Sequence, residues 1–136
     1  MLKFPYVALP SKMGNVYKPL IKVRFNYLKT HKITLPVVAL IDSGADVCFC
    51  SDFIGAWLGI QFNKIKKDEE FTAANGQTFK AKPVNISVFI ENINYKSTIY
   101  FTDVLPRQTP IILGQIGFFD RFKITFNATE GYIQIG

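Results

Sequence analysis

A run of apolar residues that ends abruptly in a carboxylate is the feature that most constrains how this chain can fold. Residues 37–41, Val-Val-Ala-Leu-Ile, are followed at once by Asp42 and by the turn-forming pair Ser43-Gly44. A strand buried on both faces reads as a continuous apolar run, and Asp is disfavoured inside such a strand. An ionised carboxylate is costly to desolvate unless it is paired or hydrogen-bonded. Asp42 is therefore either a turn residue that bonds the backbone two residues on or a functional carboxylate.

Composition and turn signals predict a single all-β domain over residues 1–136. The chain contains 13 Phe and 6 Tyr, which favour sheet over helix, and its short apolar runs are separated by turns as in barrels and sandwiches. Alternation of apolar and polar residues predicts a half-buried strand over 20–27. The pair Asn75-Gly76 is a strong hairpin signal. Residues 1–17, which contain two prolines, are expected to form an irregular N-terminal segment.

Two short helices are expected within this β domain. A helix over 53–58 should end at Gly59, because glycine readily takes the left-handed conformation that follows a helix. A second helix is expected over 115–122. The tail should then close with a hairpin made of strands at 124–126 and 132–135.

The charged residues, cysteines and histidine give little sign of a nucleic-acid or metal site. The formal net charge is +6, but the lysine-rich run 64–67 is followed at once by the acidic run 68–70, a mixture typical of a solvated loop. A nucleic-acid-binding protein normally clusters Arg and Lys on one element. Cys48 and Cys50 are too close for good disulfide geometry and are interpreted as small buried hydrophobes, while His31 is the one histidine. We therefore expect no metal or other cofactor and no nucleic-acid partner.

Hydropathy gives no sign of a membrane partner. No stretch is long and apolar enough to cross a bilayer, and residues 1–10 lack the apolar segment of a secretory signal. The sequence as given is therefore expected to be cytoplasmic.

Three short segments, taken in order, carry a family resemblance. They are residues 41–46 (Ile-Asp-Ser-Gly-Ala-Asp), 71–79 (Phe-Thr-Ala-Ala-Asn-Gly-Gln-Thr-Phe) and 111–119 (Ile-Ile-Leu-Gly-Gln-Ile-Gly-Phe-Phe). They resemble the active-site segment, the flap hairpin and the second signature of the retropepsins, the retroviral and retroviral-like aspartic proteases. The resemblance covers about residues 18–136. It implies an all-β, retropepsin-like acid-protease barrel with one or two short helices and one lobe per chain.

The resemblance implies peptide hydrolysis centred on Asp42. Two carboxylates a few ångströms apart, as in the aspartic proteases, can activate a water and protonate a carbonyl, because one keeps its proton while the other is ionised. This chain has one Asp-Ser-Gly and supplies half of such a pair. The symmetric solution is a two-fold homodimer whose axis passes between two copies of Asp42. The expected function is a homodimeric aspartic endopeptidase that acts on polypeptides.

The resemblance also implies roles for neighbouring residues. Ser43 should hydrogen-bond across the dimer axis and Gly44 should accept a hydrogen bond from the scissile peptide, so both join Asp42 as catalytic residues. Asp46 should bind the substrate main chain, and the flap should close over the substrate. Apolar side chains flanking the cut should enter pockets lined by apolar residues. The expected substrate-binding residues are Ala45, Asp46, Val47, Ala73, Ala74, Asn75, Gly76 and Ile112.

Departures from the viral pattern leave alternatives open. Gln115 stands where viral enzymes usually have Arg, and an amide can hydrogen-bond Asp46 but cannot form a bidentate ion pair. The helix over 53–58, absent from minimal viral enzymes, points to the cellular or bacterial branch, and a retroelement-derived member is a further possibility. Because fold does not guarantee function, one alternative is a catalytically silent retropepsin-like domain that dimerises or binds peptides. Another is an unrelated β-barrel with an accidental motif.

Overall fold

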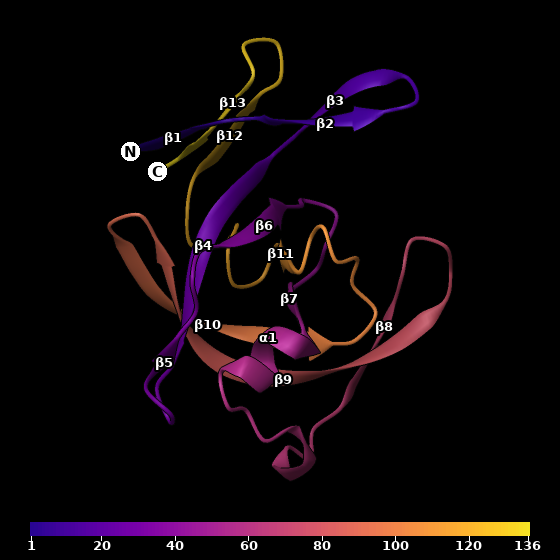
Figure 1. The fold of residues 1–136 in the computed structure, drawn as a ribbon, viewed down its shortest axis with the longest axis vertical. Coiled ribbons are helices and arrows are strands. Elements are labelled where there is room, and N and C mark those ends of the chain that lie inside the picture. The colour runs from indigo at the N-terminus through magenta and orange to yellow at the C-terminus, as the bar shows by residue number, and fades with distance from the viewer.

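The computed structural model describes all 136 residues, and its strands form three sheets (Figure 1). The strands are β1 (Leu2–Pro5), β2 (Val7–Ser11), β3 (Gly14–Lys18), β4 (Leu20–Tyr27), β5 (Lys32–Ile33), β6 (Val37–Ile41), β7 (Cys48–Ser51), β8 (Glu69–Thr72), β9 (Thr78–Ile90), β10 (Ile93–Thr102), β11 (Ile111–Leu113), β12 (Ile124–Asn127) and β13 (Tyr132–Ile135). The helices are α1 (Asp52–Trp57) and a 3-10 turn, η1 (Phe62–Lys64). Neither is long and apolar enough to span a membrane.

The largest sheet closes into a barrel. Its strand order is β5-β4-β6-β11-β7-β10-β9-β8, and β4 pairs additionally with β9, which closes the six strands between them into a ring. Strands β6 and β11 run parallel at its centre, with Ala39 opposite Ile111. Both strands therefore end at the same edge of the barrel, where Asp42 and Gly114 follow them. The all-β architecture predicted from composition and turn signals is confirmed.

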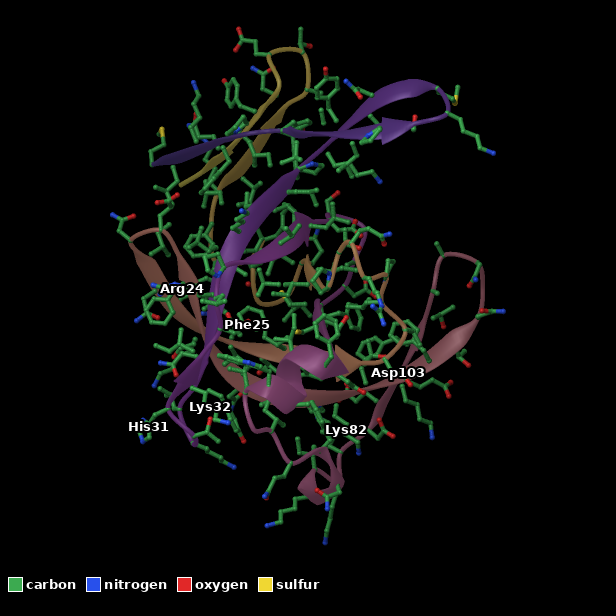
Figure 2. All side chains as sticks on the ribbon, viewed as in Figure 1. Arg24, Phe25, His31, Lys32, Lys82 and Asp103 are labelled. Atoms are coloured by element: carbon green, nitrogen blue, oxygen red, sulfur yellow. The ribbon has the colours of Figure 1, made fainter.

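Alternating burial along β4 shows how the sequence pattern builds the core. Val23 and Phe25 are buried while Lys22 and Arg24 are exposed, and Figure 2 shows Phe25 beside Arg24 on this strand. Burying the apolar residues of each strand on one side of the sheet removes them from water at roughly 1.5–3 kcal/mol for each large side chain. The predicted strand over 20–27 is confirmed.

The expectation of an irregular segment over residues 1–17 is wrong. Strand β1 pairs with β13 in a second sheet, ordered β1-β13-β12, and β2 and β3 form a separate two-stranded hairpin. Proline interrupts strands in general, so the two prolines favour an irregular segment when the sequence is considered alone. Pro5 ends the edge strand β1, and Pro10 lies in a hairpin strand with one unpaired edge, positions where proline is tolerated.

Of the two expected helices, only the first forms. Helix α1 is followed by Gly59 at φ +78°, as predicted for the segment 53–58. The expected helix over 115–122 is wrong, because Gly117 takes φ +104° and interrupts the helical path. Its amide donates instead to the Asp120 carboxylate, at 3.0 Å, so the segment forms a series of turns. The closing hairpin predicted at the tail is present as β12 and β13.

Candidate active site

Asp42 lies directly after β6, where main-chain and side-chain bonds fix its position. Its amide donates to the carbonyl of Leu113 at 2.9 Å, which ties the end of β6 to the end of β11. Its Oδ1 accepts a hydrogen bond from the amide of Gly44 at 2.9 Å. The side chain is half-buried. Asp42 therefore makes the turn bond expected of a turn residue, and this bond holds the carboxylate in one orientation.

The segment that follows β11 crosses closely over the segment that follows Asp42. A Cβ added to Gly114 would lie 2.2 Å from the carbonyl oxygen of Val47 and 2.6 Å from that of Ala45, so only glycine fits. The next amide, that of Gln115, donates to the carbonyl of Ala45 at 2.8 Å. The segment after β11 thus packs directly against the segment that follows Asp42.

The side chain of Gln115 bonds the loop that follows Asp42 and does not bond Asp46. Its Nε2 donates to the carbonyl of Ser43 at 2.8 Å. Asp46 is exposed, and the ion pairs of the molecule, Lys67 with Glu69 and Arg121 with Asp120, lie elsewhere. Asp46 therefore has no basic partner. Gln115, which stands where viral enzymes usually have Arg, bonds the carbonyl of Ser43 instead.

A cleft of about 680 Å³ lies beside Asp42. Of the predicted site residues, the cleft brings together Asp42, Gly44, Ala45, Asp46, Ala73, Ala74, Asn75 and Ile112. Three others do not line it. Ser43 and Gly76 are exposed outside it, and Val47 is buried, where it packs with Phe49 and Ala81.

The hairpin of β8 and β9 borders this cleft with its tip, as the Asn75-Gly76 signal predicts. The turn is closed by the amide of Gly76 donating to the carbonyl of Ala73 at 2.9 Å. Asn75 Oδ1 accepts from the amide of Gln77 at 3.0 Å. Gly76 takes φ +85°, and no atom lies within 4 Å of where its Cβ would be. We call residues 69–81, the paired part of this hairpin and its turn, the flap.

An aromatic cluster that the sequence interpretation missed forms one wall of the cleft. Phe71 of β8 and Phe79 of β9 lie with ring centroids 5.0 Å and 5.5 Å from that of Phe49 on β7. Tyr100 of β10 lies 5.2 Å from Phe71. Phe49, Phe71 and Phe79 line the cleft. Phe71 and Ala73 are two apart in an extended segment and so share a face, which is the signal that could have identified Phe71.

The other residues of the cleft carry no such signal. They are Glu70, Thr72, Gln77, Thr78, Val104 and Leu105. Thr72, Gln77 and Thr78 lie within the segment 71–79 that resembles a flap hairpin, and Glu70 directly precedes it. Val104 and Leu105 follow β10 and reach the cleft only because β10 pairs in parallel with β7.

Both cysteines are buried free thiols, as interpreted from their spacing. Cys48 Sγ accepts a hydrogen bond from the amide of Gly114 at 3.4 Å. Burial raises the pKa of Cys48 to about 11, which keeps this thiol neutral. The environment of Cys48 is thus that of a packing residue behind the site.

The described side chains form no group of three or more His, Cys, Asp or Glu that could hold a metal ion. His31 lies at the turn between β4 and β5, on the opposite side of the view from the flap (Figure 2). It has no place in the cleft.

Comparison of the sequence with protein-family models and with curated proteins finds no match. Comparison of the structure with solved structures finds similarity to a retropepsin-like aspartic protease from Rickettsia conorii. The TM-score is 0.64, the sequences are 17% identical, and the match covers 98% of this chain and 98% of that chain. The resemblance carried by three short segments is therefore confirmed at the level of the fold: this chain has the retropepsin-like fold.

Proposed function

We propose that the chain is a homodimeric aspartic endopeptidase in which two Asp42 carboxylates, one from each subunit, activate the water that hydrolyses a peptide bond. One observation carries the proposal. In a chain with the retropepsin-like fold, Asp42 directly follows the apolar strand β6 and lies in a cleft bordered by the flap. The turn bond from Gly44 orients the carboxylate, and a turn alone would not require a cleft beside it.

The chemistry requires the second subunit. The chain has one Asp-Ser-Gly, and a lone carboxylate cannot be both the base for water and the acid for the carbonyl oxygen. In the proposed dimer the two Asp42 carboxyls share one proton, because like charges so close cannot both ionise. The ionised carboxylate takes a proton from water as the water oxygen attacks the carbonyl carbon. The protonated partner donates its proton to the carbonyl oxygen.

Ser43 and Gly44 complete the proposed catalytic loop. The exposed Ser43 is free to hydrogen-bond with the other subunit across the axis, while Gln115 holds its carbonyl. Gly44 holds Asp42 through its amide and offers its carbonyl to the substrate. These contacts support the role of the loop as a rigid base for the reaction.

The proposed substrate is a polypeptide held in extended form between the Asp42 loop and the flap. Ala45 and Asp46 would contact its main chain on one side, and Ala74, Asn75 and Gly76 would contact it from the flap. Ala73 and Ile112 line the cleft together with the aromatic wall, which favours apolar side chains on both sides of the cut. Val47 packs in one cluster with Phe49 and would act by supporting this wall.

Cleavage of an unbiased peptide library tests the proposal. Protein shown by sedimentation to be dimeric should release products between about pH 3 and 7, with a bell-shaped pH–rate profile, because one carboxyl must be protonated and the other ionised. The Asp42→Asn variant should abolish cleavage. The matched variant Asp68→Asn, which removes an exposed carboxylate outside the cleft, should leave it unchanged.

Two results would contradict the proposal. A dimeric protein that releases no product from the library is not the proposed enzyme. If the same protein binds peptides equally well with and without Asp42→Asn, the catalytically silent peptide-binding domain becomes the better interpretation.

A further inference from the structure

The hairpin of β2 and β3 has no partner within the chain. Its strands pair with each other and with no other strand, and every residue except Leu9 is exposed. Val16 is 42% exposed and Tyr17 60%. We call residues 7–18 the arm. A two-stranded hairpin alone is marginally stable in water, so a surface that covers the arm is to be expected.

Both faces of the arm carry apolar side chains. Residues directly opposite each other in an antiparallel pair share a face. Leu9 lies opposite Val16, while Ala8 lies opposite Tyr17 on the other face. A hairpin that packs on its own domain with one face normally keeps the other face polar. The arm has no such polar face, which favours insertion against another molecule.

The molecule that we expect to cover the arm is a second copy of the chain. Each chain has one Asp-Ser-Gly and so supplies half of the proposed carboxylate pair. The Asp42 loop consists largely of small residues, and a stable dimer normally buries about 800 Å² on each partner. Figure 1 shows the arm extending toward the same side of the view as the flap. An additional apolar surface for a partner is thus present on that side.

We propose that the arm is a dimerisation element that packs against a second copy of the chain in the same dimer that brings the two Asp42 residues together. This inference rests on the proposed function, because the half dyad supplied by each chain is what requires a second copy. The arm supplies the apolar area that the catalytic loop lacks. A free arm in the monomer is only marginally ordered, so dimerisation orders the arm and completes the site together.

The test compares two strand residues of equal exposure. Val16 on the arm and Ile33 on β5 are each 42% exposed, and both are β-branched. Val16→Asp should raise the dimer dissociation constant about tenfold or more, the effect expected for loss of an apolar interface residue. Ile33→Asp should leave the constant within about twofold of wild type. Sedimentation equilibrium measures both, and circular dichroism confirms that each variant is folded.

Hydrogen exchange of the wild-type protein provides a test that needs no mutation. Amides of β2 and β3 should be protected above the dimer dissociation constant and exchange rapidly below it, while amides of β6 and β11 should be protected at both concentrations. Arm amides that exchange at the same rate at all concentrations would overturn the proposal, even if Val16→Asp failed to fold.

The outcomes separate this inference from the proposed function. A dimer that cleaves peptides and is unaffected by Val16→Asp overturns the role of the arm and leaves the protease intact. A dimer that is dissociated by Val16→Asp but never cleaves supports the arm and contradicts the protease. Wild-type protein that is monomeric at all concentrations overturns both.

Discussion

The flap and the arm are built by the same local chemistry. Each is an antiparallel hairpin with a glycine of positive φ in its turn, Gly76 at +85° and Gly14 at +96°. At each glycine, no atom lies within 4 Å of where a Cβ would be. In each turn a side-chain oxygen, of Asn75 or Ser11, accepts a hydrogen bond from the amide two residues on. Turn residues therefore explain why both hairpins form, but not what they do.

The two hairpins differ in what lies beneath their strands. The flap strands place Phe71 and Phe79 against Phe49 of the barrel, so the strands of the flap are anchored within the chain. The arm strands contact no comparable cluster and are exposed on both faces. The difference agrees with the roles that we propose, a lid for the anchored flap and a contact with a second copy of the chain for the arm.

The largest expected effect comes from removing the anchor of the flap. Phe49 is buried at the centre of the cluster, so Phe49→Ala should lower the free energy of unfolding by about 3–5 kcal/mol. Tyr17→Ala on the arm should lower it by less than about 0.5 kcal/mol below the dimer dissociation constant, as for an exposed residue. Urea denaturation of dilute protein measures both. Equal losses in the two variants would show that the arm is anchored within the monomer after all.

The second prediction concerns the pH dependence of the free energy of unfolding, which arises from Cys48 on β7, next to the flap anchor Phe49. Burial raises the pKa of Cys48 from 9.0 to about 11, so as the pH rises the unfolded chain loses this thiol proton before the folded chain does. The contribution of the neutral thiol is complete below pH 9 and is lost as the pH rises through 11. Relative to Cys48→Ala, the wild-type protein should lose up to about 3 kcal/mol of its free energy of unfolding across this range.

Urea midpoints of the two proteins at pH 8 and pH 11 check this prediction. The adjacent residue Phe49 points to the opposite face of β7, beneath the flap, so the loss should reach the flap amides in hydrogen exchange. A constant difference between wild type and Cys48→Ala at both pH values would contradict a buried, neutral Cys48.

Substitutions of the turn glycines of the two hairpins should have smaller effects, each confined to the function proposed for its own hairpin. An alanine at positive φ costs about 1–2 kcal/mol, so Gly76→Ala and Gly14→Ala should each weaken their own hairpin. Gly76→Ala should change kcat and KM for a cleaved peptide without changing the dimer dissociation constant. Gly14→Ala should raise that constant by up to about tenfold and leave KM unchanged once the dimer is saturated. The reverse pattern would exchange the roles assigned to the hairpins.

The sequence predicted those features that depend on neighbouring residues. The apolar run that stops at Asp42 predicts that this residue ends a strand. The pair Asn75-Gly76 predicts the hairpin turn of the flap. The helix over 115–122 failed because nothing local shows that Gly117 takes a positive φ. The strands within residues 1–17 are not predicted because proline is tolerated only at unpaired strand edges, and the local sequence does not show which edges are unpaired.

The composition of the cleft was predicted only in part for a related reason. The place of residues next to Asp42 and Asn75 in a motif predicts that they line the cleft. No motif predicts this for Phe49, because its contacts with Phe71 and Phe79 join strands far apart in the sequence. Val47, expected in the cleft, is instead buried in one cluster with Phe49 and Ala81, and its place in the motif does not show this. Local patterns thus locate the turns, and pairing between distant strands decides which side chains meet.

The smallest expected effect concerns the side chains that close the two turns. Asn75→Ala removes the bond to the amide of Gln77, and Ser11→Ala removes the bond to the amide of Met13. Because both bonds are exposed, each loss should cost only about 0.5–1 kcal/mol. Hydrogen exchange at the amides of Gln77 and Met13 measures this loss, which should appear as roughly two- to fivefold faster exchange.

In the dimer the Met13 amide should be partly shielded if a partner covers the turn of the arm, so Ser11→Ala should then have the smaller effect. Equal acceleration in monomer and dimer would place the turn of the arm outside the interface and confine the proposed contact to the strands of the arm.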